Sequence, residues 1–231
     1  MTFRQERRPS CIDGLPAGSH SGYCAAMISA EEALERLREG NRRFVSDAVS
    51  EETLASREHR AGAAVPQSPF AIILACSDSR VPTELIFDRG IGDLFVIRVA
   101  GNVVAPSQIG SIEYAAKQFG TSLVVVLGHS NCGAVIATMQ EMALKESHRS
   151  PNLRAIVDRV RPALEAILQD GCDVDDEAVV SSCVRANIQA SVKKLHHGSL
   201  ILEDLIESGD LKIVGAEYSI ETGNIEFFED D

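Results

Sequence analysis

The chain has no tryptophan, few other aromatic residues and no apolar run of the length that a membrane span requires. Of its 231 residues, 5% are aromatic and 24% are charged. A transmembrane helix needs about 20 mostly apolar residues in a row, and the first 27 residues lack the apolar core of a secretory signal. The sequence therefore predicts a cytoplasmic protein without a membrane span.

An excess of basic residues is also missing. Lys and Arg number 22 against 34 Asp and Glu, which gives a formal net charge of −12. Binding to nucleic acid or to an anionic membrane surface relies on basic patches. The charge balance argues against both kinds of partner and indicates a well-solvated acidic surface.

Cysteine is too scarce and too scattered for a disulfide scaffold. The six residues are Cys11, Cys24, Cys76, Cys132, Cys172 and Cys183. In a reducing compartment they are expected to be thiols or metal ligands. Residues 1–27 hold two of them but are rich in Arg, Ser, Gly and Pro without periodicity, so we predict a flexible arm there.

Residues 28–231 are predicted to form a single α/β domain. Ser29 and Glu32 make a capping box at the start of a first, amphipathic helix. Short strands are expected at 70–75, 94–99 and 122–127, with a closing hairpin around 222–224. Because the first three strands are apolar on both faces and alternate with helical segments, we expect a mainly parallel central sheet flanked by helices. An N-terminal helical arm and a C-terminal β-hairpin complete the predicted fold.

Three chemically active side chains fall at one predicted edge of this sheet. Cys76 directly follows the first strand, and His129 and Cys132 follow the third. The carboxyl ends of parallel strands share an edge, where ligands bind, and the start of a helix favours a thiolate at Cys132. Two thiolates and one imidazole suit Zn²⁺ and leave its fourth position open, as in catalytic zinc sites.

The stretch "CSDSR" adds Asp78 and Arg80 beside the first cysteine. Asp78 could be a fourth zinc ligand, which would close the site and make it structural. Alternatively it pairs with Arg80, whose planar fork suits bidentate contact, and accepts a hydrogen bond from zinc-bound water. A simple surface ion pair is the third option.

These motifs resemble those of the β-class carbonic anhydrases. "CSDSRVP" matches that family's Cys-x-Asp-x-Arg signature, "GHSNCGA" matches its His-x-x-Cys, and the likeness runs over roughly 28–229. The resemblance implies reversible hydration of CO₂ to bicarbonate and a proton, by attack of zinc-bound hydroxide. It also implies a homo-oligomer, either a dimer or a dimer of dimers.

The resemblance further implies a role for each matched position. The zinc ligands would be Cys76, His129 and Cys132, the catalytic dyad Asp78 and Arg80, and the substrate-binding residues Gln67, Phe95, Tyr114 and Gly133. A neighbouring subunit would complete the aromatic part of the pocket. Some bacterial members bind bicarbonate at a second site through a tryptophan, which this chain lacks, so an open site with Asp78 off the metal is expected.

Three other interpretations remain open at this point. The same scaffold could hydrolyse CS₂ or COS, depending on access to the pocket. A closed, four-ligand site would indicate a non-enzymatic zinc module that binds a partner. A thiol redox protein is the third, although Cys76 and Cys132 do not form a Cys-x-x-Cys pair.

Overall fold

A five-stranded sheet forms the centre of the part of the chain that the structure describes. In this computed structural model that part comprises residues 28–48, 66–142, 150–168 and 176–228, so the predicted arm at 1–27 lies outside it. The strands are β1 (Ala71–Ala75), β2 (Leu94–Arg98), β3 (Leu123–His129), β4 (Lys212–Tyr218) and β5 (Ile225–Phe227). They lie in the order β2-β1-β3-β4-β5.

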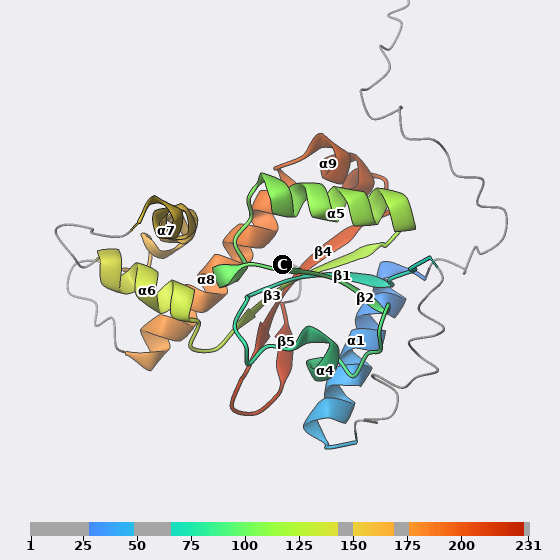
Figure 1. The fold of residues 1–231 in the computed structure, drawn as a ribbon, viewed down its shortest axis with the longest axis horizontal. Helices are drawn as coiled ribbons and strands as arrows, with labels where there is room; N and C mark the ends of the chain where they lie inside the picture. Colours follow the sequence, from blue (N-terminus) through green and yellow to red (C-terminus); the bar gives the residue numbers. More distant parts are fainter. Residues whose placement is uncertain (1–27, 49–65, 143–149, 169–175, 229–231) are drawn as a thin grey trace, which may run out of the picture.

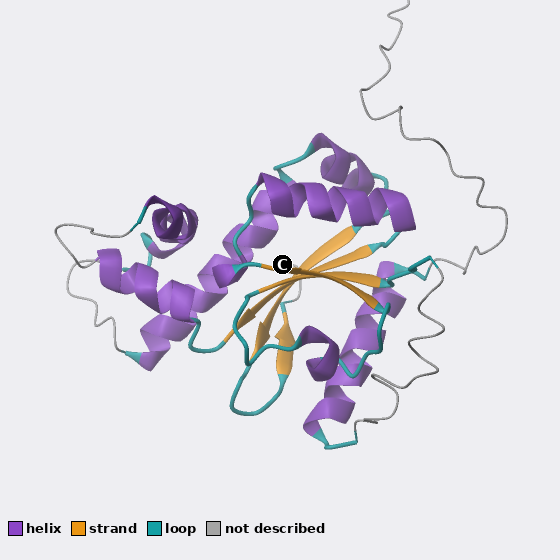
Figure 2. Cartoon of the chain, in the orientation of Figure 1, coloured by secondary structure: helices purple, strands orange, loops and turns teal. Residues whose placement is uncertain are grey.

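Helices cover both faces of the sheet. They are α1 (Ala30–Val45), α4 (Thr83–Ile86), the 3₁₀ turn η1 (Ala100–Asn102), α5 (Pro106–Phe119), α6 (Gly133–Met142), α7 (Pro151–Leu164), α8 (Glu177–His196) and α9 (Leu200–Glu207). Figure 1 and Figure 2 show α1 and α4 against one face, α5, α8 and α9 against the other, and α6 and α7 beside α8. This is the predicted α/β architecture.

The strands are apolar on both sides because each side meets a helical layer. Ile72 and Leu74 of β1 belong to the core shared with α5 and α8, whereas Ile73 and Ala75 belong to the core shared with α1. All five residues of β1 and all seven of β3 are buried. Each fully buried branched side chain contributes about 1.5–3 kcal/mol of hydrophobic stabilisation.

The strand pairing confirms the mainly parallel sheet. β1 runs parallel to β2 and β3, and β3 runs parallel to β4. Among the strands of the described residues, only the C-terminal pair, β4 with β5, is antiparallel, which confirms the predicted hairpin. The carboxyl ends of β1, β2 and β3 consequently lie at one edge of the sheet.

Helix α1 begins where the capping pattern predicts. The Ser29 hydroxyl accepts a hydrogen bond from the Glu32 backbone N–H over 3.1 Å. Further along, the buried Asn41 side chain donates to the carbonyl oxygens of Ile86 and Gly223 over 3.0 and 2.8 Å. Its Oδ1 atom accepts from the Ile225 N–H over 2.9 Å. One amide side chain thus joins α1 to α4 and to the closing hairpin.

Two local features differ from the sequence prediction. The third strand was expected to end at residue 127 but runs through His129, because residues 128 and 129 continue the parallel ladder with β4. The short elements α4 and η1 were not predicted. Each has only three or four residues, too few to show a hydrophobic period.

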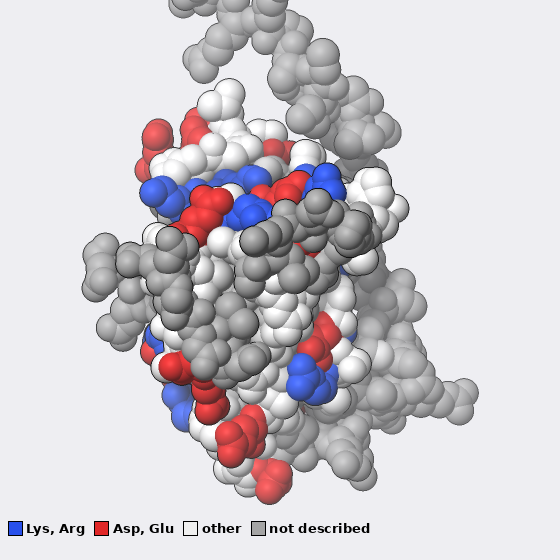
Figure 3. Space-filling model, turned by 90° about the vertical axis from the view of Figure 1, so that its left-hand side faces the viewer, with Lys and Arg blue, Asp and Glu red and all other residues white. Residues whose placement is uncertain are grey.

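Charged side chains of both signs are mixed on the surface. On the face shown in Figure 3, basic and acidic side chains of the described residues lie next to one another. Among the described residues, no helix is both long enough and apolar enough to cross a membrane.

Candidate metal centre

The structure brings Cys76, His129 and Cys132 together at the carboxyl edge of the sheet. Cys76 immediately follows β1, His129 ends β3, and Cys132 precedes α6. The sulfur and nitrogen atoms that could bind a metal lie within 4.8 Å of one another, and all three residues are buried. The convergence that the strand pattern predicts is therefore present.

His129 directs one ring nitrogen into this cluster. Its Nδ1 atom lies 2.9 Å from the Ser130 carbonyl oxygen, which can only accept, so Nδ1 carries the proton. The Nε2 atom is fully buried and has no hydrogen-bond partner among the described residues. An unpaired buried nitrogen costs free energy, and a metal ion is the partner that such a tautomer suits.

The two thiols share hydrogen bonds that favour ionisation of Cys76. Pairing with Cys132, together with the hydrogen bond from the Gly101 backbone, lowers the pKa of Cys76 to about 4 against the opposing effect of burial. The same pairing with Cys76, together with burial, raises the pKa of Cys132. Cys76 therefore ionises more readily than Cys132. A cation bound by both sulfurs would displace the remaining thiol proton.

A buried polar network supports the Cys76 thiolate from outside. The Gly101 N–H donates to the Cys76 Sγ atom over 3.3 Å. Gly101 has a φ of 66°, and its carbonyl oxygen accepts from the Asn187 side chain over 2.9 Å. Ser191, one turn further along α8, donates to the Asn102 carbonyl oxygen over 3.1 Å.

Sequence reasoning did not find this network. The available signal is a pair of polar residues, Asn187 and Ser191, four positions apart on the buried face of α8. Residues four apart share a helix face, so the pair marks a polar spot in an apolar layer. Their partners, 86 and 89 positions away, follow only from the packing of α8.

Asp78 adopts the paired arrangement rather than joining the metal-ligand cluster. The Arg80 side chain donates to its two carboxylate oxygens over 2.9 and 2.7 Å, and the Arg80 backbone N–H donates to Oδ1 over 3.0 Å. The Arg80 hydrogen bond holds the pKa of Asp78 well below its usual range. Asp78 Oδ2 lies 3.8 Å from His129 Nε2, so an ionised carboxylate borders the cluster.

The remaining predicted site residues lie at different distances from this cluster. Gly133 directly follows Cys132 and is exposed, and Gln67 is exposed before β1. Phe95 pairs with Ile72 near the amino ends of the strands. Its ring centre lies 6.3 Å from that of Tyr114, a side chain that is 51% exposed. Within one chain, the aromatic pair is not at the carboxyl edge.

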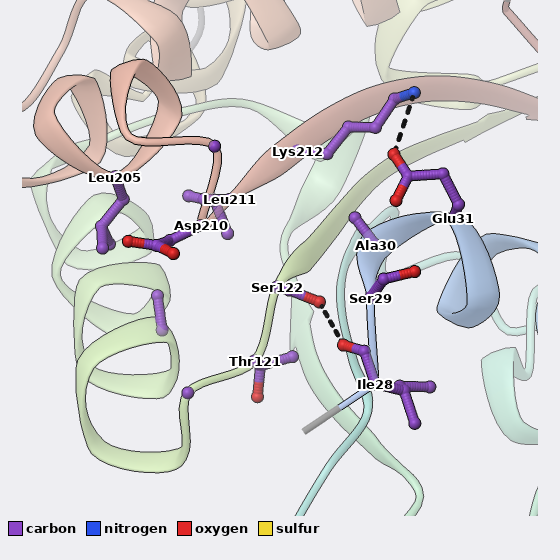
Figure 4. Close-up of a pocket in the computed structure, with 13 residues that line it drawn as sticks. Ile28, Ser29, Ala30, Glu31, Thr121, Ser122, Leu205, Asp210, Leu211 and Lys212 are labelled. Atoms are coloured by element: carbon purple, nitrogen blue, oxygen red, sulfur yellow. Dashed lines mark hydrogen bonds and ion pairs between the residues drawn. The ribbon is translucent and has the colours of Figure 1, made fainter. Parts of the chain in front are cut away.

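A groove of about 690 Å³ lies at the opposite, amino end of the sheet. Figure 4 shows two interactions beside it. Ser122 donates to the Ile28 carbonyl oxygen over 3.0 Å, and Lys212 lies 3.9 Å from Glu31. None of the predicted site residues is among those that line this groove, so the groove is separate from the cluster.

The cluster fits zinc. Two sulfurs and one imidazole nitrogen are a common zinc donor set, and sulfurs bound to one tetrahedral zinc lie about 3.8 Å apart. The separations here are within 4.8 Å, so small side-chain movements are sufficient. Three ligands from the protein leave one tetrahedral position for a small molecule.

Comparison with known proteins identifies similar sequences that cover most of the chain. A family model described as "Carbonic anhydrase" matches residues 71–225. Carbonic anhydrase 2 of Mycobacterium tuberculosis is 38% identical over 194 residues, covering 83% of this chain and 89% of that protein. A carbonic anhydrase of Mycolicibacterium smegmatis is 36% identical over 195 residues, covering 84% of this chain and 91% of that protein.

The fold agrees with these relatives. The solved structure of the β-carbonic anhydrase CcaA superposes with a TM-score of 0.66 at 28% identity, covering 86% of this chain and 88% of that one. The chain belongs to the β-class carbonic anhydrase family.

Proposed function

We propose that this carbonic anhydrase catalyses the zinc-dependent, reversible hydration of CO₂ to bicarbonate and a proton. The observation that carries the proposal is the buried cluster of Cys76, His129 and Cys132 beside an ionised carboxylate. Bound zinc would supply Lewis-acid activation of water near neutral pH. The match to named carbonic anhydrases over most of the chain supports this reaction.

Asp78 and Arg80 are proposed to organise the substrate side of the centre. Because two hydrogen bonds from Arg80 engage the carboxylate, Asp78 stays ionised at the border of the cluster and is paired with Arg80 rather than acting as a metal ligand. An ionised carboxylate can only accept hydrogen bonds. It can therefore orient a water molecule through that molecule's proton and leave an oxygen lone pair free to attack CO₂.

The pocket for CO₂ is proposed to form between subunits. Tyr114 is half exposed and packs with Phe95 on the side of α5, where it is available to the centre of a neighbouring chain. Gln67 and Gly133 would donate hydrogen bonds to bicarbonate. This arrangement requires a dimer at least, and light scattering on the purified protein tests it.

We propose that residues 28–231 act as one catalytic domain, with 1–27 outside it, and that the protein works in the cytoplasm. The mixed surface charges and acidic balance support a small-molecule substrate over nucleic acid. Cell fractionation with an antibody to the full chain tests the location.

The deciding experiment is stopped-flow measurement of CO₂ hydration by protein of known zinc content. CS₂ and COS are offered in parallel, since a similar centre could hydrolyse them. We expect turnover of CO₂ that is proportional to zinc content. Hydrolysis of CS₂ without hydration of CO₂ would replace the proposed substrate, and a zinc-loaded protein inactive on all three would indicate a structural zinc module.

A further inference from the structure

Arg98 bridges two main-chain carbonyl groups of the segment that carries Cys76 and Asp78. Its Nε atom donates to the Cys76 carbonyl oxygen over 3.1 Å, and its Nη2 atom donates to the Asp78 carbonyl oxygen over 2.5 Å. None of the ion pairs among the described residues involves Arg98. Among the residues that the structure describes, its guanidinium thus contacts the loop and forms no ion pair with a carboxylate.

The sheet places Arg98 where it can do this. Arg98 is the last residue of β2 and pairs with Ala75, the last residue of β1. The backbone N–H of the following residue, Val99, donates to the Ala75 carbonyl oxygen over 3.1 Å. Two residues later the Gly101 N–H donates to the Cys76 sulfur. The segment 98–101 thus contacts the Cys76 loop through one side chain and two backbone groups.

The two bridged carbonyls belong to alternate residues around Ser77. Holding both of them restrains the peptide planes that directly follow Cys76 and Asp78, and with them the directions in which these two side chains leave the backbone. The Asp78 carbonyl oxygen also accepts from the Val81 N–H over 3.1 Å. The loop is consequently held at both of its functional residues.

We propose that Arg98 is a positioning residue, which sets the geometry of Cys76 relative to Asp78 through this two-carbonyl bridge. Groups that orient metal ligands from behind typically change metal affinity or activity by about 10–100-fold when they are removed. Arg98 would thus control both retention of zinc and the alignment of Asp78. Only the kinetic part of this inference rests on the proposed function.

A lysine variant distinguishes the effect of the two-carbonyl bridge from the effect of the positive charge. The guanidinium presents several donors in a rigid plane, whereas a lysine ammonium is a compact charge that lacks this fork. Arg98→Lys keeps the positive charge near the thiolates but is not expected to bridge both carbonyls in the same geometry. Arg98→Met removes charge and donors together and keeps an apolar stem.

The test uses full-length, zinc-loaded protein and measures the rate at which zinc is transferred to a chromogenic chelator, together with kcat and KM for CO₂ hydration. The matched control is Arg159→Met, because Arg159 also donates to a main-chain carbonyl, that of Ala155 over 2.5 Å, on the surface of α7. Circular dichroism verifies that each variant is folded.

We expect both Arg98 variants to release zinc about tenfold faster than wild type, with a fall in kcat and little change in KM, while Arg159→Met behaves as wild type. Wild-type zinc release by both Arg98 variants would overturn the proposal, whatever their turnover. Full recovery of zinc retention in Arg98→Lys would also overturn it, since charge alone would then be sufficient. If the wild type does not hydrate CO₂, the zinc-release comparison still decides the role of Arg98.

Discussion

The backbone N–H of Gly101 donates a hydrogen bond to the Cys76 sulfur over 3.3 Å, joining η1 to the residue after β1. Gly101 has a φ of 66°, and a Cβ atom there would meet the Ala134 Cβ at 3.1 Å. We therefore expect Gly101→Ala to turn the N–H away from Cys76 and to weaken zinc binding by about tenfold. Competition with a zinc chelator at equilibrium measures this effect.

Gly209 provides the control for backbone strain alone. Its φ is 80°, but a Cβ atom there would meet nothing within 4 Å. Gly209→Ala should cost about 1–2 kcal/mol of stability through the left-handed backbone and leave zinc affinity unchanged. Equal loss of zinc affinity in both variants would contradict a specific role for the Gly101 hydrogen bond.

Asp78→Asn tests the carboxylate without changing its shape. The amide carries no negative charge, so it accepts a hydrogen bond from water less strongly than the carboxylate does and orients the water less well. We expect zinc content to remain and kcat for CO₂ hydration to fall by about 10²-fold. Asp204→Asn, at an exposed position of α9, should leave kcat unchanged. Full activity in Asp78→Asn would remove Asp78 from the proposed mechanism.

Asn41 is expected to matter for stability and not for turnover. Its side chain bonds to Ile86 of α4 and to Gly223 and Ile225 of the closing hairpin. Asn41→Ala would leave those buried backbone groups without partners, at a cost of about 2–4 kcal/mol in the free energy of unfolding. Urea denaturation at a fixed protein concentration measures this cost.

The control for this change is Asn152→Ala on the exposed face of α7. It should shift the urea midpoint very little, and both variants should keep the wild-type kcat per zinc. A wild-type midpoint for Asn41→Ala would show that water replaces the lost hydrogen bonds.

Much of the fold could be predicted because its causes are local. The run from Ala71 to Ala75 is apolar at every position, which is typical of a strand in a sheet that is covered on both faces. Since such strands are parallel, their carboxyl ends had to bring Cys76 near His129. The metal-ligand cluster could be predicted because Cys76 and His129 each lie at the end of an apolar strand and because parallel strands end at the same edge of a sheet.

The supporting contacts could not be predicted because they join segments that only tertiary packing brings together. Asn187 reaches Gly101 from a helix 86 residues away, and nothing near Asn187 in the sequence specifies that partner. The sequence likewise left several roles open for Asp78, and the geometry of the loop in the structure pairs it with Arg80.

Glu217 provides a prediction for the pH dependence of stability. Burial raises its pKa in the folded chain, although Arg185 lies 3.4 Å away. When folding raises the pKa of an acid, the ionised form of that acid destabilises the folded chain. This destabilisation is absent below the unfolded pKa of about 4.3, grows as the pH rises, and is complete above the folded pKa. Glu217→Gln should therefore be more stable than wild type at about pH 8, with the difference narrowing toward about pH 5.

Glu226 should show the opposite sign. Its hydrogen bonds with Arg185 lower its pKa, so its ionised form stabilises the folded chain and that contribution is lost as the pH falls through the folded pKa. Glu226→Gln should be slightly less stable than wild type at about pH 8. Urea midpoints across the pH range test both variants, and a Glu217→Gln variant that is less stable at every pH would contradict the burial argument.

The central claim is that activity depends on one zinc ion held by Cys76, His129 and Cys132. The most direct measurement removes the metal with a chelator, adds zinc back in steps, and follows CO₂ hydration at each step. We predict that turnover disappears with the metal and returns in proportion to bound zinc, until one ion per chain is bound. Undiminished hydration by protein shown to be free of metal would contradict the account.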